Sequence, residues 1–200
     1  MKTNIFGYLL TIIVLLVLTG CSSASRTLPP DSQYHVFSFE RDMEGWIATG
    51  TDLDDPPVGW SIERSQDIAS DGKASVRLYL NNMNDAGKIW IEQAFDVRPD
   101  CLYDVHVAYD LASADWSDVN LWTIITGVVP ESSKAELIYQ GDTGNNAKPE
   151  DGFVWLLKSF SFTVNSGPEG KLNVMIGIWG TWETARTYYL DDLSISFAAK

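Results

Sequence analysis

The chain has 200 residues, and its 27 acidic side chains against 14 basic ones give a formal net charge of −13 at pH 7. A nucleic-acid backbone or an anionic lipid surface would be repelled by this charge, so neither is expected as a direct partner. A neutral ligand, a cation or a basic protein surface is compatible with it. The length suits a single domain with a substantial core, and we find no internal repeat.

The N-terminal segment has the composition of an export signal. Lys2 precedes an apolar run from Ile5 to Leu18 and small residues before Cys21, which is the order of charge, apolar core and cleavage site. Residues 18–21, Leu-Thr-Gly-Cys, resemble the lipobox of bacterial lipoproteins. The resemblance implies that residues 1–20 are removed and that Cys21 carries a diacylglycerol and an acyl chain such as palmitate. An uncleaved signal anchor is the alternative, because roughly 20 apolar residues span a bilayer.

Covalent lipid would hold the protein on a membrane without a spanning helix, since each buried methylene contributes about 0.8 kcal/mol. Residues 21–33 have the small, polar and proline-containing composition of a solvated tether, and residues 34–200 form the predicted domain. Ser22 stands where inner-membrane lipoproteins commonly carry aspartate, so the resemblance favours the outer membrane or cell surface. With Cys21 acylated, Cys101 has no disulfide partner and is expected as a small buried apolar side chain.

Short segments of alternating apolar and polar residues predict strands, and we find no long amphipathic helix. In chain order the predicted strands are 36–39, 74–80, 88–97, 103–109, 119–125, 159–164, 172–178 and 188–197. Residues 52–59 and 139–152 are rich in turn-forming residues and are predicted as loops. Eight or nine strands suit an all-β domain of two packed antiparallel sheets, a β-sandwich of jelly-roll type.

The alternation also assigns one face of each strand to the core. In 88–97, Trp90 lies on the polar face, opposite a core face of Ile89, Ile91, Phe95 and Val97. Core faces in the other strands comprise Val76, Leu78 and Leu80; Tyr103, Val105, Val107 and Tyr109; Phe160, Phe162 and Val164; and Leu172, Val174, Ile176 and Ile178.

Four short motifs resemble the galactose-binding-like jelly rolls, which include the carbohydrate-binding modules of families 4, 9 and 22. In chain order they are Phe37–Glu40 with Glu44–Trp46, Ser70–Ser75, Phe153–Val164 and Tyr189–Leu193. Their order along residues 36–197 is more specific for the fold than for a sugar. The resemblance implies a non-catalytic domain that binds a glycan or polysaccharide.

The same resemblance implies a structural calcium ion held by Glu40, Asp71 or its neighbours, and Asp191, with carbonyl oxygens from the intervening turn. A jelly roll brings its first and last strands side by side, and a cation would relieve the repulsion between the converging carboxylates. The alternative is that Glu40 makes a local cap or salt bridge while Asp191 and Asp192 are solvated at a strand edge.

Aromatic residues opposite the core pattern are the candidates for ligand binding. Sugar rings present apolar C–H faces and a rim of hydroxyls, so stacking aromatics beside polar groups can bind them. Alternatively, several of these tryptophans pack under loops or cover the second sheet face. The candidate aromatics are Tyr79, Trp90, Trp122 and Trp179, with Trp116 and Trp182 in loops, and the polar candidates are Arg77, Glu92, His106 and Asn120.

An enzyme is not expected, because the serine-hydrolase, zinc-protease, P-loop and dinucleotide-binding motifs are absent from the sequence. Cys101 and His106 are five residues apart and would lie on opposite faces of a regular strand, which disfavours a nucleophile pair. Two carboxylates suffice for a glycosidase, and the sequence leaves that open. We expect an anchored, non-catalytic glycan-binding lipoprotein; the alternative is a lipoprotein whose sandwich serves protein–protein interaction or envelope assembly.

Overall fold

The computed structural model describes residues 30–114, 122–131 and 152–200. The strands of these ranges are β1 (Ser32–Phe37), β2 (Ile47–Thr51), β3 (Gly59–Ser65), β4 (Ser75–Asn82), β5 (Lys88–Asp96), β6 (Leu102–Ser113), β7 (Trp122–Pro130), β8 (Val154–Asn165), β9 (Lys171–Gly180) and β10 (Thr184–Ala199). Among the described residues, no helix is long and apolar enough to cross a membrane.

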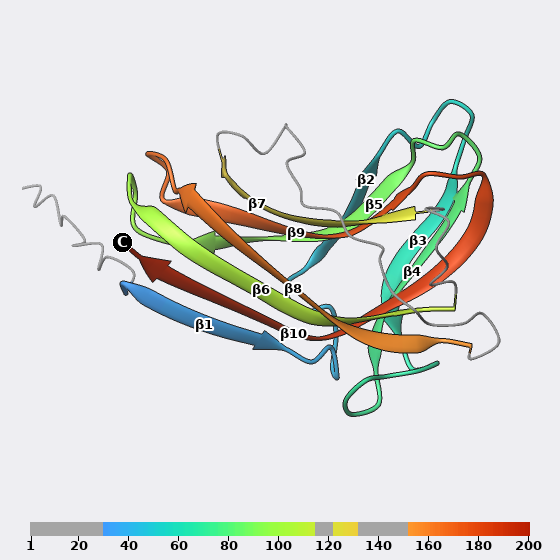
Figure 1. Ribbon diagram of the computed structural model, residues 1–200, viewed down its shortest axis with the longest axis horizontal. Coiled ribbons are helices and arrows are strands. Elements are labelled where there is room, and N and C mark those ends of the chain that lie inside the picture. Colours follow the sequence, from blue (N-terminus) through green and yellow to red (C-terminus); the bar gives the residue numbers. More distant parts are fainter. Residues whose placement is uncertain (1–29, 115–121, 132–151) are drawn as a thin grey trace, which may run out of the picture.

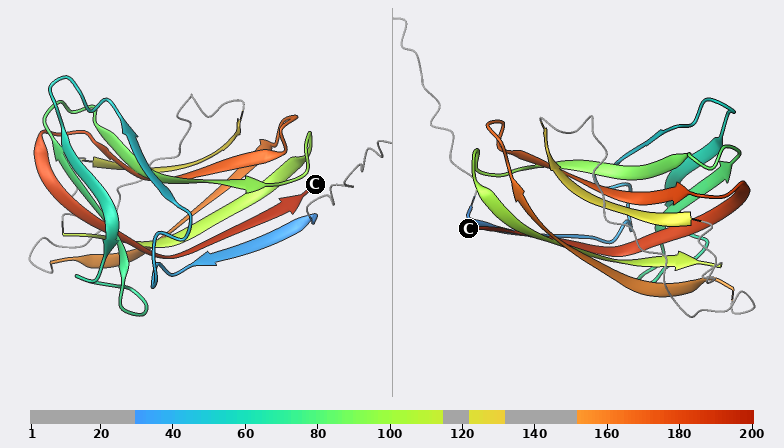
Figure 2. Two further views of the ribbon diagram at one scale, coloured as in Figure 1. Left: turned by 180° about the vertical axis from the view of Figure 1, so that it is seen from behind. Right: turned by 45° about the horizontal axis from the view of Figure 1, so that its top comes forward.

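The strands form two antiparallel sheets that pack face to face (Figure 1). One sheet has the order β3-β4-β10-β6-β8, with β1 as a further partner of β10, and the other has the order β2-β5-β9-β7. Figure 2 shows the two layers from behind and from above. The predicted all-β sandwich of two antiparallel sheets is confirmed.

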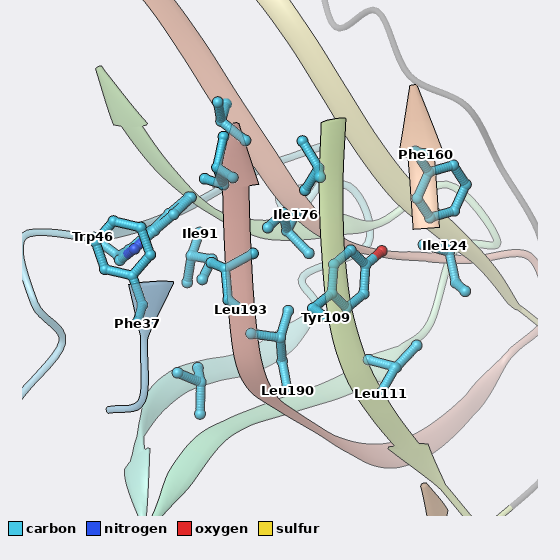
Figure 3. Packing of buried hydrophobic residues seen from close by; sticks show 14 of the residues in the cluster. Phe37, Trp46, Ile91, Tyr109, Leu111, Ile124, Phe160, Ile176, Leu190 and Leu193 are labelled. Carbon is cyan, nitrogen blue, oxygen red and sulfur yellow. The ribbon is translucent and has the colours of Figure 1, made fainter. Parts of the chain in front are cut away.

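The core lies between the sheets and is built from the predicted apolar faces. Every core-facing residue assigned in β4, β5, β6 and β9 is buried in one cluster, and Phe160 of β8 joins it. Rings meet edge to face within the cluster, as Phe37 and Trp46 do at 5.4 Å (Figure 3). Tyr109 is also buried, and its hydroxyl shares a 2.6 Å hydrogen bond with Thr126 of the facing sheet. Period-two alternation therefore identified the inner faces of these strands correctly.

Strand β10 lies in the interior of the six-stranded sheet and pairs with other strands on both sides. Its first half, from Thr184 to Leu190, pairs with β4, and its second half, from Leu193 to Ala198, pairs with β1. Against β6 on its other side, the register shifts between Asp191 and Ser194, which is a β-bulge. Strands β1 and β4 therefore lie end to end along β10 and meet at the bulge.

Two strands, β2 and β3, were not predicted from the sequence. Strand β2 contains a glycine in five residues, and both strands are half-exposed edges, so neither has a continuous apolar face. At the domain start, Ser32 and Gln33 already belong to β1, within the segment predicted as tether. The end of the predicted strand 119–125 extends to Pro130.

Candidate functional site

Asp191 lies at the bulge of β10 and is fully buried. One carboxylate oxygen, Oδ2, accepts hydrogen bonds from the backbone N–H groups of Ser70 at 2.8 Å and Asp71 at 3.1 Å. The other, Oδ1, accepts the N–H of Asp192 at 2.8 Å. Burial raises the pKa of the Asp191 carboxyl, and the three amide hydrogen bonds oppose this by lowering it. Asp191 thus fixes the turn that precedes β4 onto β10.

Glu40, just after β1, holds the other end of the same turn. Its Oε1 accepts the N–H groups of Lys73 at 2.7 Å and Ala74 at 3.0 Å, and these bonds lower the pKa of the carboxyl. Gly72, which directly precedes Lys73, has a φ of +67°, and a Cβ at this position would lie 2.3 Å from Glu40 Oε1. The "DG" turn therefore needs glycine for both its conformation and its contact with Glu40.

Topology brings Glu40 and Asp191 to one turn, as the resemblance requires, but the three predicted calcium ligands do not form one cluster. The side chain of Asp71 is exposed, and both oxygens of Asp191 already accept amide hydrogens. Within the described ranges, no group of three or more such side chains is placed to hold a metal ion. A calcium ion bound by fewer side chains with backbone oxygens stays a prediction.

The candidate ligand residues are divided between the two outer faces of the sandwich. Arg77, Tyr79 and His106 alternate with core residues of β4 and β6, so they lie on the outer face of the six-stranded sheet. Trp90 and Trp179 lie on the outer face of the four-stranded sheet. One ligand cannot contact both faces, so the predicted set is not a single site. Alternation predicted which side chains of a strand face outward, but it could not predict which strands belong to the same sheet.

On the six-stranded sheet the polar candidates are engaged with neighbours. Arg77 is 3.2 Å from Glu63, and its guanidinium lies 5.5 Å from the centre of the Tyr79 ring. His106 Nδ1 is 3.1 Å from the Ser161 hydroxyl at the rim of a shallow depression of about 410 Å³. This depression has hydroxyl groups on its walls and no tryptophan.

The prediction for Trp122 is wrong. Its side chain is 2% exposed and lies in the main core, where its ring centre is 4.8 Å from that of Tyr188. Strand β7 is apolar on both faces, with Ile124 facing the core and Ile125 facing outward, so alternation could not assign its inner face.

Trp90 does face away from the main core, but it is 9% exposed and offers no open ring face. It belongs to a second apolar cluster on the outer face of the four-stranded sheet, with Ile125, Val129 and Met175. Its indole Nε1 donates to Glu92 Oε2 at 3.0 Å. Trp90 therefore supports this face and fixes the Glu92 carboxylate.

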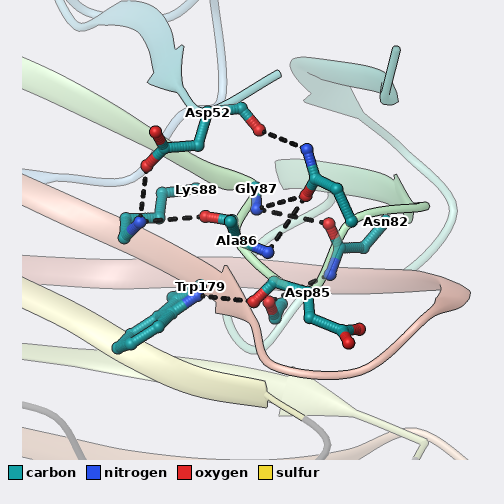
Figure 4. Close-up of polar contacts among 9 residues, drawn as sticks. Asp52, Asn82, Asp85, Ala86, Gly87, Lys88 and Trp179 are labelled. Atoms are coloured by element: carbon teal, nitrogen blue, oxygen red, sulfur yellow. Dashed lines mark hydrogen bonds and ion pairs between the residues drawn. The ribbon is translucent and has the colours of Figure 1, made fainter. Parts of the chain in front are cut away.

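Trp179 is held at the other end of the same face by the turn between β4 and β5 (Figure 4). Its Nε1 donates to the backbone oxygen of Asp85 at 3.2 Å, and Lys88 Nζ lies 4.8 Å from its ring centre. Lys88 is itself fixed by Asp52 at 2.7 Å. These contacts give Trp179 a structural role in the turn.

The remaining candidates differ in exposure. Trp182, in the turn between β9 and β10, is 60% exposed, as expected for a loop position. Cys101 is a free thiol packed partly against the core, so it is less buried than predicted. Three predicted residues lie outside the described ranges, namely Cys21, Trp116 and Asn120.

A polar notch lies beside the first residue of β2. At this point the pairing of β2 with β5 ends, and the rest of β5 has no strand partner on that side. The notch has a volume of about 230 Å³ and is lined by Gly45, Ile47, Glu92, Gln93, Ala94 and Asn173. Ile47 at its rim is 62% exposed, whereas Glu92 is 9% exposed and Asn173 is 1% exposed. The notch thus combines an exposed apolar side chain with buried polar ones.

Two buried oxygen atoms of the notch residues, Gln93 Oε1 and Asn173 Oδ1, have no hydrogen-bond partner among the described residues. The Asn173 amide is oriented by its nitrogen, which donates to Glu131 Oε2 at 2.7 Å. Buried acceptors without protein partners are rare in folded proteins, and an ordered water molecule commonly satisfies them.

Sequence reasoning found Glu92 but missed most of the notch. Asn173 shares the outer face of β9 with Trp179, so alternation placed it correctly, yet an isolated asparagine carries no signal for binding. Ile47 and Gly45 gave no signal because β2 was not predicted. Gln93 was unrecognised because its position depends on where β2 stops pairing with β5.

No family model matches the sequence, and no curated protein matches it either. Among solved structures, the chain is similar to the K3 cleaved adhesin domain of Lys-gingipain from Porphyromonas gingivalis, with a TM-score of 0.54 and 11% identity over 80% of this chain and 97% of that one. The K1 cleaved adhesin domain of the same protein has a TM-score of 0.52 and 11% identity over 82% and 97%. The CBM22-1 xylan-binding domain from Paenibacillus barcinonensis has a TM-score of 0.45 and 17% identity over 83% and 94%.

At these identities the likeness concerns the fold alone. The β-sandwich fold that the sequence motifs led us to expect is confirmed by the sheet topology and by the two adhesin-domain structures. What the domain binds has to be argued from its own residues.

Proposed function

We propose that this protein is an exported lipoprotein, anchored through Cys21, whose β-sandwich binds a glycan without catalysing a reaction. The observation that carries the binding proposal is the notch beside β2, where exposed Ile47 borders buried polar side chains. A sugar ring has an apolar face and hydroxyl groups at its rim, so it can meet both kinds of group at once. The anchor rests on the sequence of residues 1–21.

The carboxylates that lie together in the fold support a non-catalytic role. Asp110 and Asp191 are opposite one another on β6 and β10, and a glycosidase uses a pair of carboxylates that flank the glycosidic bond. However, Asp110 accepts the hydroxyl of Ser70 and Asp191 accepts three backbone amides. Both carboxylates are thus used to hold the turn before β4.

Calorimetry of the full-length protein against xylan, galactan and cell-wall glycans tests the proposal. The protein is kept in a nonionic detergent without sugar groups, so that the detergent cannot compete. We expect saturable binding that Ile47→Asp weakens by about tenfold or more, since a loss near 1.4 kcal/mol is tenfold in affinity. Val36→Asp is the control: it is 55% exposed on a short strand of the other sheet, and should leave glycan affinity unchanged.

Protein docking is the second candidate, and exposed apolar residues on the six-stranded sheet favour it. Tyr34 and Leu157 are 70% and 71% exposed on its outer face, and Val36 lies on the same face. If no glycan binds, and a partner protein loses affinity for Val36→Asp but not for Ile47→Asp, the glycan proposal is replaced by this one.

A further inference from the structure

Strand β1 is an edge strand of the six-stranded sheet, and its open side lacks the features that normally protect such an edge. Within the described ranges it pairs only with β10 (Figure 1). Edge strands in soluble proteins usually carry charges, proline, a bulge or a cover, because their free backbone groups can pair with another chain. The six residues of β1, Ser-Gln-Tyr-His-Val-Phe, include no acidic residue, lysine, arginine or proline, and their register against β10 is regular.

The other two edge strands of this sheet carry charged residues. Strand β3 contains Glu63 and Arg64, and in β8 the side chain of Lys158 points inward and is 7% exposed. Inward-pointing charge is one of the devices that keep an edge strand from pairing with a further chain. In β1, by contrast, Tyr34 and Val36 are 70% and 55% exposed. Strand β1 is therefore the edge of this sheet that is best suited to accept another strand.

The backbone of β1 shows which groups are available on the open side. The Asp31 carbonyl accepts the N–H of Ala199 after β10, so the backbone groups of residue 31 face β10. In an antiparallel pair, alternate residues direct their N–H and C=O groups to opposite sides. Ser32, Tyr34 and Val36 therefore direct these groups to the open side, and the same three residues have exposed side chains.

The partner that this edge fits is a second copy of β1. In a two-fold antiparallel pair centred on Tyr34, this residue lies opposite Tyr34 of the second copy, and Ser32 lies opposite Val36. All three open residues then form hydrogen-bonded pairs, whereas a centre at Gln33 or His35 leaves one of them without a partner in β1. The facing tyrosines add an aromatic pair across the strands.

Charge also favours this pairing over contact through other surfaces. The chain has a net charge of −13, so most surfaces of two copies repel each other. Strand β1 contains no charged residue of this kind, and Asp31 before it forms an ion pair with Arg98. Two β1 strands can therefore meet without placing carboxylates opposite one another.

We infer that the protein forms a symmetric dimer in which two β1 strands pair and join the two six-stranded sheets into one. The inference goes beyond glycan binding and does not depend on it, because the notch lies on the other sheet. A six-residue strand is about 20 Å long, so the interface is small. The dimer is therefore weak and forms as the protein concentration rises.

Single cysteines in the full-length Cys101→Ser protein test the pairing by oxidative cross-linking in nonionic detergent. In the dimer the two Tyr34 Cα atoms are about 5.5 Å apart, which a disulfide can span, whereas the two Val36 Cα atoms are offset by roughly 13 Å along the strands. Tyr34→Cys should cross-link increasingly with concentration, and Val36→Cys should not. Leu157→Cys, at a position 71% exposed on β8, measures cross-linking by random collision.

Val36→Pro tests whether the backbone edge makes the contact. The Val36 N–H points to the open side, so proline removes no hydrogen bond to β10 but removes one from each copy in the dimer. In the Tyr34→Cys protein it should slow cross-linking about tenfold and leave the melting temperature unchanged. Val36→Thr is the matched control, because it keeps the N–H and the β-branched side chain, and should cross-link like its parent.

Equal cross-linking of the three cysteine variants, or none for Tyr34→Cys at any concentration, overturns the dimer. Cross-linking that a folded Val36→Pro variant leaves unchanged overturns pairing through the backbone edge. If Val36→Pro lowers the melting temperature, the Ser32→Cys/Val36→Cys variant decides: it should form a dimer joined by two disulfides, and its failure to do so overturns the pairing. No glycan is used in these measurements, so a failure of the glycan proposal leaves them unaffected.

Discussion

At the scale of single residues, Gly72 is the position where one added methyl group has the clearest consequence. It has a φ of +67°, and its added Cβ would lie 2.3 Å from Glu40 Oε1, the oxygen that accepts two amide hydrogens from the same turn. Gly72→Ala should therefore destabilise the fold twice, by left-handed backbone strain and by displacing the Glu40 carboxylate. Urea unfolding of the full-length protein measures the loss.

Gly152 provides the matched control for this prediction. Its φ is +72°, and no atom of the described residues lies within 4 Å of an added Cβ. Gly152→Ala should cost only the backbone strain, about 1 kcal/mol. Gly72→Ala should cost more, and the excess should vanish in a Glu40→Ala background. Equal costs for the two glycines in the wild-type background would show that Glu40 simply moves aside.

The role of a residue could be predicted where the residue belonged to a recognisable short motif. The "DG" turn, the glutamate after β1 and the paired aspartates of β10 were identified from the sequence, and the structure brings them together. Trp122 was misassigned because both faces of its strand are apolar, and Gln93 was missed because its exposure depends on the end of a neighbouring strand. Such properties arise from pairing between strands, which one strand's pattern does not contain.

At the scale of elements, the bulge of β10 joins three segments that are far apart in the sequence. Glu40 after β1, the turn before β4 and Asp191 in β10 all meet there. The predicted calcium ion would add a fourth link at this junction. Among the described residues, Glu40 Oε2 accepts no hydrogen bond, so it is the carboxylate oxygen left for a cation.

The calcium prediction is tested by the melting temperature of the full-length protein in calcium and after addition of EDTA. We expect calcium to raise the melting temperature and EDTA to reverse the rise, because an ion would tie β1 to the turn before β4. Glu40→Gln should lose most of this response. An unchanged melting temperature in the wild-type protein would show that the five amide hydrogen bonds to Glu40 and Asp191 suffice without metal.

At the scale of the whole molecule, the sandwich presents two outer faces with different chemistry. The four-stranded sheet has a buried apolar cluster and the polar notch, while the six-stranded sheet has hydroxyl groups and exposed apolar side chains. Composition and alternation were enough to predict the fold class and most inner faces. They could not assign the outward-facing side chains to one sheet or the other, because that assignment depends on the order of strands in each sheet.

The proposed attachment of the domain to a membrane concerns the whole chain, and the two cysteines of the chain allow it to be tested. The N-terminal end of β1 lies beside the C-terminal end of β10, where the Ala199 N–H donates to the Asp31 oxygen at 2.8 Å. A tether before residue 30 would therefore leave the domain at the end of the sandwich where β10 ends (Figure 1). Lipid at Cys21 would hold the domain from this end.

Expression in a lipoprotein-processing bacterium, with a labelled fatty acid in the medium, measures the modification directly. The wild-type protein should take up label and have the mass of residues 21–200 plus lipid, because two or more acyl chains give stable membrane attachment. Cys21→Ser should lose the label and keep residues 1–20, since the signal peptidase requires the lipidated cysteine. Cys101→Ser changes the other thiol, which lies within the folded domain, and should be labelled like the wild type. An unlabelled wild-type chain that retains residues 1–20 would instead identify the apolar run as a signal anchor.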